Sequence, residues 1–148
     1  MSKDYMKYSR LKVLIVDDGE VTRGLIRGVL AQLWITSVTE ASDGKAGLLE
    51  LLRTRPDIVL CDVHMPLSGL EFLKRVRNVS IQEIAATPII MLTSDSSKET
   101  VEAATDLGIQ GYLLKPVVLH QLKARIDAIL YAPAAGAPTA GAPAAGEE

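Results

Sequence analysis

Three acids, a hydroxyl and an amine stand at the ends of short apolar runs in this 148-residue chain. Asp17 and Asp18 follow the first run, Asp62 follows the third, Thr93 follows the fourth and Lys115 follows the fifth. If these side chains meet, the three carboxylates repel one another, and a single Lys offsets one charge only. A hard divalent cation would relieve this repulsion, and Mg²⁺ fits because it needs only one or two carboxylates and keeps several waters.

Each signal taken alone also has an ordinary structural explanation. A pair of Asp residues can open a turn that caps the next helix, and a Lys before a Pro suits a strand end that leads into a helix. The combination of all these signals is harder to explain as ordinary structure, because the groups recur at the same end of successive apolar runs. In an open parallel sheet, ligands bind beyond the carboxyl ends of the strands, so the recurrence favours a functional site.

The elements that would position these groups follow from hydrophobic periodicity. Apolar runs rich in Val, Ile and Leu predict five strands, over residues 11–16, 35–40, 57–61, 88–92 and 110–114. The segments between them show helical spacing. In the first of these segments the spacing places one set of apolar residues on one face of the helix: Val21, Leu25, Ile26, Val29, Leu30 and Leu33. Strands that alternate with helices, several of them apolar on both faces, predict a five-stranded parallel sheet covered on both sides.

Composition restricts the class of protein. The single Cys excludes an internal disulfide and suits a reducing compartment. No apolar run reaches the ~20 residues of a membrane span, and there is no signal-peptide pattern, so we expect a cytoplasmic protein without membrane insertion. All 16 Lys and Arg and 16 of the 18 acids lie before residue 132. Because the globular part is formally neutral, direct DNA binding is not expected.

The chain divides into three segments. Residues 1–10 are mildly basic and are expected to form a frayed, solvated N-terminal arm. Residues 11–131 hold the predicted strands and helices and would form one domain. Residues 132–148 are an Ala-, Pro- and Gly-rich repeat that cannot build a core, so we expect a disordered tail or linker.

Four motifs resemble those of a known family. The stretches "VLIVDDGEVTR", "DIVLCDVHMP", "TPIIMLTS" and "GYLLKP", with the intervals between them, are similar to the CheY-like receiver domain of response regulators, the phosphoacceptor module of two-component signalling. The resemblance covers residues 11–130. It implies a flavodoxin-like, doubly wound (βα)5 fold with a five-stranded parallel sheet.

The resemblance also implies roles for the acids. Asp62 would be the phosphoacceptor, and a carboxylate can attack phosphorus when a metal neutralises the phosphoryl oxygens. Asp18, Asp62 and the main-chain carbonyl of His64 would hold Mg²⁺, and Asp17 would act through water or as a further ligand. Lys115 would pair with a phosphoryl oxygen as a point charge, and the Thr93 hydroxyl would donate to another.

Phosphorylation in this family changes the population of two conformations, which implies a switch. Thr93 would move toward the phosphate and Tyr112 would turn inward, altering a surface over residues 98–130 that a protein partner reads. His64 and Asp95 occupy positions that tune the lifetime of the phosphoryl group. The implied donor is a sensor histidine kinase or a phosphotransferase.

The expected function is therefore a stand-alone receiver that catalyses only its own phosphorylation and dephosphorylation. Other functions are alternatives to it. A metal-dependent phosphatase of the haloacid-dehalogenase type would carry a second acid two residues after its nucleophile, where this chain has His64. A pseudo-receiver scaffold would lack some of the site residues. The receiver half of a longer regulator and a phosphorelay intermediate stay open.

The sequence departs from the family pattern at three places. The loop "MPLSG" is one residue shorter between its Pro and its Gly, although Pro66 and Gly69 are still expected to shape the approach to Asp62. The segment 78–87 is longer, so the third helix or its exit loop is expected to be extended. Trp34 stands where Gly is usual, and we expect a turn without positive φ, with Trp34 packed over the end of the helix.

Overall fold

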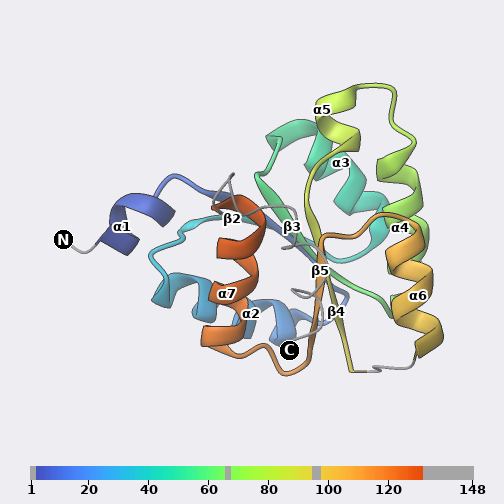
Figure 1. Cartoon of the computed structure of the whole chain (residues 1–148). Helices are drawn as coiled ribbons and strands as arrows, with labels where there is room; N and C mark the ends of the chain where they lie inside the picture. Colours follow the sequence, from blue (N-terminus) through green and yellow to red (C-terminus); the bar gives the residue numbers. More distant parts are fainter. Residues whose placement is uncertain (1–2, 66–67, 95–97, 132–148) are drawn as a thin grey trace.

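The computed structural model describes residues 3–65, 68–94 and 98–131, which form helices around one parallel sheet (Figure 1). The elements in chain order are α1 (Lys3–Tyr8), β1 (Lys12–Val16), α2 (Glu20–Gln32), β2 (Ser37–Ala41), α3 (Gly44–Thr54), β3 (Ile58–Asp62), α4 (Gly69–Arg77), α5 (Gln82–Ala85), β4 (Ile89–Thr93), α6 (Lys98–Asp106), β5 (Gly111–Leu114) and α7 (Leu119–Leu130). The strands lie in the order β2-β1-β3-β4-β5, all parallel. The predicted flavodoxin-like, doubly wound sheet is confirmed.

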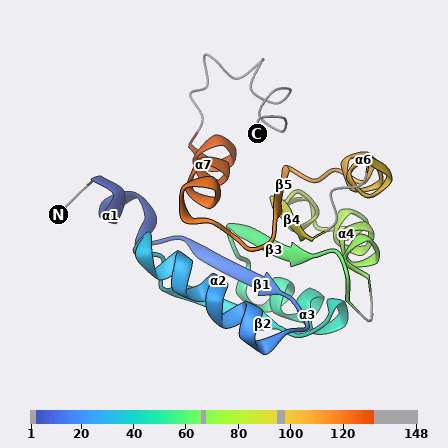
Figure 2. The same ribbon diagram turned by 90° about the horizontal axis from the view of Figure 1, so that it is seen from below.

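Helices lie on both faces of the sheet (Figure 2). Each face carries a separate apolar core. On one face α2 and α7 pack through Ile26, Leu30, Leu122 and Ile126. On the other, α3, α4 and α6 pack against the sheet, with Phe72 of α4 fully buried. Strands β3 and β4 are buried at every residue, because both of their faces are covered.

The predicted strands are present within one or two residues of their observed bounds, and polar caps define several helix ends. The Asp43 carboxylate accepts a hydrogen bond from the Ala46 amide at the start of α3. The Ser68 hydroxyl accepts from the amide of Leu70 at the start of α4. Gly108, just after α6, has φ +90, the left-handed conformation that Gly commonly adopts where a helix ends.

The apolar stripe of α2 is only partly buried. Ile26, Leu30 and Leu33 are in the core, but Val21 and Leu25 are 77% and 66% exposed. Periodicity predicts the stripe but not how much of it the neighbouring elements cover. The amino-terminal half of α2 therefore presents apolar side chains to solvent.

The prediction of a frayed, solvated arm is wrong for its carboxyl-terminal part, because α1 is anchored to the domain. Tyr8 is fully buried and belongs to the same apolar core as Ile126. Its hydroxyl donates to the carboxylate of Asp127 on α7, and Tyr131 donates to the main-chain oxygen of Lys7. The domain boundaries at residues 11 and 131 stay a prediction.

The turn after α2 also differs from its prediction. Trp34 has φ 68 and is 51% exposed. Its amide donates to Ala31, and the amide of the buried Ile35 donates to Leu30, which is the hydrogen-bond pattern of a Schellman motif. These two hydrogen bonds and the burial of Ile35 outweigh the cost of a left-handed conformation at a residue other than Gly, about 1–2 kcal/mol.

The segment 78–87 contains α5, whose Ile84 is buried against α4. The predicted disordered tail at 132–148 lies outside the described residues. Within the described part of the chain, no helix has both the length and the apolar character to cross a membrane. The cytoplasmic location stays a prediction.

Candidate functional site

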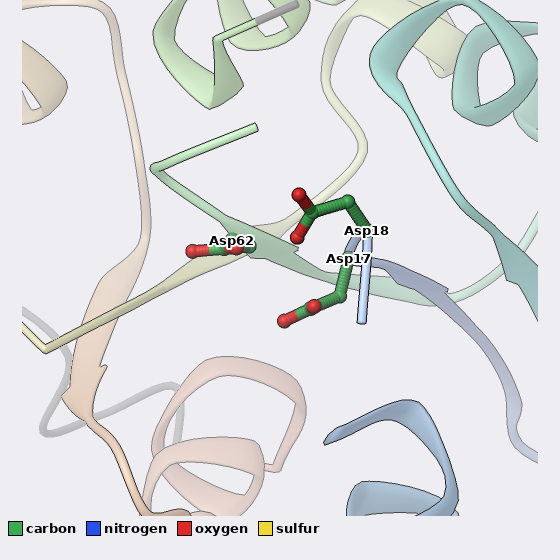
Figure 3. Close-up of side chains that lie close together, drawn as sticks. All are labelled: Asp17, Asp18 and Asp62. Atoms are coloured by element: carbon green, nitrogen blue, oxygen red, sulfur yellow. The ribbon is translucent and has the colours of Figure 1, made fainter. Parts of the chain in front are cut away.

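Strands β1 and β3 are neighbours in the middle of the sheet, so their carboxyl ends bring acids together (Figure 3). Asp17 follows β1 directly, and Asp62 ends β3. These two residues and Asp18 each offer a carboxylate oxygen, and the three oxygens lie within 4.8 Å of one another. Asp17 and Asp62 are 1% and 4% exposed, whereas Asp18 is exposed. The structure thus brings together the three acids that the sequence singled out.

Lys115 reaches this cluster from the end of β5. Its ammonium lies 2.8 Å from the Asp17 carboxylate and 3.4 Å from the Asp62 carboxylate. The main-chain amide of Lys115 donates to the carbonyl of Thr93 at 2.8 Å, which ties the end of β5 to the end of β4. The Lys115–Pro116 peptide bond is cis.

The electrostatics of the site leave an excess of negative charge. Burial raises the pKa of Asp62, and the Asp17 charge adds to this, although the His64 amide and Lys115 oppose it. Burial alone would lower the pKa of Lys115, but its contacts with Asp17 and Asp62 outweigh burial and raise it. The single ammonium is thus held by two carboxylates, but it does not offset the cost of burying the charge of Asp62.

The donor set fits a hard divalent cation. The clustered ligand atoms are carboxylate oxygens, the type that Mg²⁺ prefers, and one of the three acids is open to solvent, which leaves room for the waters that Mg²⁺ keeps. A cation would also favour the charged form of Asp62, whose pKa is raised chiefly by burial and further by the Asp17 charge. The individual roles of these residues as ligands stay predictions.

The loop after β3 is built closely around the main chain of Asp62. The His64 amide donates to the Asp62 carboxylate at 3.1 Å, and the Gly69 amide donates to the Val63 carbonyl at 2.9 Å. A methyl group at Gly69 would lie 2.2 Å from the Asp62 carbonyl oxygen, so only Gly fits there. Pro66 lies outside the described residues, and the role of the His64 carbonyl stays a prediction.

Thr93 and Tyr112 lie on one face of the sheet. Tyr112 pairs with Met91, and Thr93 is two residues beyond Met91 on the same strand. Thr93 is 1% exposed, and Tyr112 is half-buried against the core on the α4 side. This placement suits the predicted switch, which stays a prediction. Asp95, predicted to tune the phosphoryl lifetime, lies outside the described residues.

A second layer of polar residues around the acids was not foreseen from the sequence. Arg23 of α2 donates to the main-chain carbonyl of Asp17 at 2.6 Å and to the Glu40 carboxylate at 2.9 Å. Arg27 forms an ion pair with the other carboxylate oxygen of Glu40. The sequence contained no signal for this contact, because Glu40 meets Arg23 only through the pairing of β2 with β1 and the packing of α2.

An apolar cavity of about 430 Å³ opens beside the acids. Leu25 and Val29 of α2 form one side, and Pro116 and Val117 form the other. Lys115 also lines the cavity, so its apolar wall continues directly into the charged site. The exposed Leu25 therefore lies on the same cavity as Lys115, which contacts Asp17 and Asp62.

Comparison with known proteins identifies a family for this chain. The family model of the response regulator receiver domain matches residues 13–127. The chain is 32% identical over 120 residues to the chemotaxis protein CheY-3 of Vibrio cholerae, covering 80% of this chain and 91% of that protein. Against the chemotaxis protein CheY of Pseudomonas aeruginosa the identity is also 32% over 120 residues, with 80% and 95% covered. A solved structure of CheY4 from Vibrio cholerae matches with a TM-score of 0.74 at 33% identity, covering 81% of this chain and 98% of that one.

Proposed function

The chain belongs to the response regulator receiver domain family, and we propose that Asp62 accepts a phosphoryl group from a phosphohistidine on a donor protein, in a Mg²⁺-dependent reaction. The observation that carries this proposal is the meeting of Asp17, Asp18 and Asp62 within 4.8 Å, with the Lys115 ammonium 3.4 Å from Asp62. Asp62 lies at the carboxyl end of β3, and a donor protein would approach from this end of the strands.

In the reaction a carboxylate oxygen of Asp62 attacks phosphorus. The P–N bond to the donor imidazole breaks, and the imidazole keeps the electron pair and takes up a proton. Lys115 and the Thr93 hydroxyl stabilise the phosphoryl oxygens through charge and a hydrogen bond. Hydrolysis of the acyl phosphate later returns Asp62 to its carboxylate, so the protein is a signalling module and not an enzyme with an external substrate.

Asp18, Asp62 and the main-chain carbonyl of His64 would hold Mg²⁺, with Asp17 acting through water or as a further ligand. When bound, the ion supplies positive charge that offsets the phosphoryl oxygens. Asp17 is already held by Lys115 at 2.8 Å and by the Gly19 amide at 2.8 Å, which keeps its carboxylate in place for that task.

The apolar wall beside Lys115 is the part of the surface that a protein donor would contact. Leu25 of this wall is 66% exposed, whereas Ile26 and Leu30 of the same helix are buried. A donor that places its phosphohistidine at Asp62 would cover this patch. Burial of the patch would supply affinity that does not depend on the phosphoryl group.

The signal that phosphorylation produces is a shift between two conformations of the sheet face that carries Thr93 and Tyr112. The charge added at Asp62 favours a state in which Thr93 moves toward the phosphate and Tyr112 turns inward. The surface of α6, β5 and α7 would change with it, and a protein partner would read that change. The relatives' role in chemotaxis makes a chemotaxis output one class of partner to test.

Incubation with acetyl phosphate tests the acceptor role without a protein donor. With Mg²⁺ present, intact mass spectrometry should show the addition of one phosphoryl group, and prior removal of the metal with EDTA should abolish it. Uptake that is equal with and without Mg²⁺, or no uptake in either case, would contradict the proposal. Capture from lysate with the Mg²⁺–beryllofluoride form as bait then identifies the partner class.

A further inference from the structure

The side chain of Arg23 contacts the backbone of the acidic turn, the Asp17–Asp18 segment after β1. Its guanidinium donates to the Asp17 carbonyl at 2.6 Å. That oxygen belongs to the peptide unit between Asp17 and Asp18. Because a peptide unit is planar, fixing its carbonyl restricts the orientation of the chain on both sides, including the Cα from which the Asp18 carboxylate extends.

The guanidinium is itself held in place. Its Nε donates to Glu40 on β2 at 2.9 Å, and its side chain is only 15% exposed. Arg27, one helical turn further along α2, binds the second oxygen of Glu40. A planar fork that donates from two different nitrogens fixes both the position and the plane of the group, which a Lys ammonium could not do.

Strand β2 holds the other side of the same turn. The Asp17 amide donates to the Ala41 carbonyl at 3.0 Å, and Ala41 is the neighbour of Glu40. Both main-chain polar groups of Asp17 are therefore tied to adjacent residues of β2, one directly and one through Arg23. The position of the turn depends on β2, although β2 contributes no acid to the site.

We propose that Arg23, oriented by Glu40, is a positioning residue that fixes the Asp17–Asp18 peptide so that the two carboxylates converge on one cation. This inference rests on the proposed function, because it assigns Arg23 to the metal site of that function. Arg23 acts through the backbone and touches neither the cation nor the phosphoryl group. Outer residues that orient metal ligands commonly change metal affinity by 10- to 100-fold.

Charge and positioning predict opposite signs for one substitution. Arg23→Gln removes a positive charge near the acids, so electrostatics alone predicts tighter Mg²⁺ binding. Loss of positioning predicts weaker binding, which we expect to be about tenfold. Arg23→Lys keeps the charge but lacks the fork, so we expect it to weaken binding as well.

Arg27→Gln is the matched control. Like Arg23→Gln, it removes one positive charge and one ion pair with Glu40. Unlike Arg23, Arg27 has no hydrogen bond to Asp17 among the described residues. We expect its Mg²⁺ affinity to stay within about twofold of the wild type. If Arg23→Gln does not fold, Arg23→Lys carries the comparison.

The measurement is the Mg²⁺ dissociation constant of the full chain by isothermal titration calorimetry, without any phosphodonor, on variants whose folding is verified by circular dichroism. Weaker binding for both Arg23 variants, with Arg27→Gln unchanged, supports the inference. Wild-type affinity in Arg23→Gln, or an equal loss in Arg27→Gln, overturns it while the proposed function stands. Absence of Mg²⁺ binding in the wild type overturns both.

Discussion

Gly69 lies against the main-chain carbonyl of Asp62 so closely that a methyl group on its Cα would be 2.2 Å from that oxygen. The same methyl group would be 2.9 Å from the Met91 side chain and from the Cα of Val63. The first turn of α4 therefore packs directly onto the backbone of Asp62, the proposed phosphoacceptor. Any enlargement at this position has to move Asp62 or the start of α4.

Gly69→Ala should destabilise the fold by about 1–3 kcal/mol, because overpacking against backbone cannot be relieved by a side-chain rotation. Phosphoryl uptake from acetyl phosphate should fall as well, since Asp62 is displaced. Urea unfolding gives the first quantity. Gly28→Ala is the control, because the added methyl group would meet no described atom within 4 Å apart from neighbouring backbone of α2, and Ala favours the helix by up to about 1 kcal/mol. Equal unfolding free energies for the two variants would contradict the packing argument.

Leu25→Glu should separate donor docking from chemistry. Leu25 lines the apolar wall beside Lys115, so a charge there should slow phosphoryl transfer from a protein donor by tenfold or more, while uptake from acetyl phosphate stays unchanged. Time courses of phosphoryl uptake, measured with the protein donor and with acetyl phosphate, give the two rates. Leu49→Glu, at an equally exposed position on α3, should affect neither rate. A loss of both activities in Leu25→Glu would place the effect on the site rather than on docking.

Tyr112 should change its environment when the site is loaded with Mg²⁺ and beryllofluoride. It is half-buried on the same face as Thr93, whereas Tyr8 is buried in the core on the opposite face. In the protein labelled with fluorotyrosine, the ¹⁹F signal that is missing in Tyr112→Phe should shift on loading, and the Tyr8 signal should stay in place. An unmoved Tyr112 signal would remove this residue from the switch.

The contact of Tyr8 with α7 should make stability depend on alkaline pH. Burial, followed by the hydrogen bond to Asp127, raises the pKa of Tyr8 from 10.0 to about 12. A raised pKa in the folded state means that this stabilisation is complete below pH 10 and is lost as the pH rises from 10 to 12. Tyr8→Phe should cost about 1 kcal/mol at neutral pH through the lost hydrogen bond and should reduce the alkaline loss.

Urea unfolding between pH 7 and 12 measures both effects. Burial also raises the pKa of Tyr131, so Tyr131→Phe is measured in parallel to subtract its part. If Tyr8→Phe and the wild type lose stability identically above pH 10, the hydroxyl of Tyr8 is not bound to Asp127 in solution.

The order of elements and the meeting of the acids could be predicted from the sequence for a clear physical reason. Buried parallel strands must be apolar throughout, so they stand out as runs, and polar residues at their ends must lie at one edge of the sheet. Asp17, Asp62 and Lys115 are far apart in the chain but follow directly from this rule. The sequence pattern therefore predicted the candidate site almost as well as it predicted the strands.

What could not be predicted depends on contacts between elements. Val21 and Leu25 follow the α2 stripe, but their exposure depends on which parts of α2 the neighbouring elements cover. The burial of Tyr8 depends on Asp127, 119 residues away in the chain. The Arg23–Glu40 pair likewise needs α2 and β2 to be placed before the contact with Asp17 can be seen.

The most direct test of the central claim locates the phosphoryl group. After reaction with acetyl phosphate and Mg²⁺, borohydride reduces an acyl phosphate of Asp to homoserine, and peptide mass mapping identifies its position. We predict homoserine at position 62 alone, and no such product in the Asp62→Asn variant. Homoserine at position 17 or 18, or undiminished phosphoryl uptake by Asp62→Asn, would contradict the assignment.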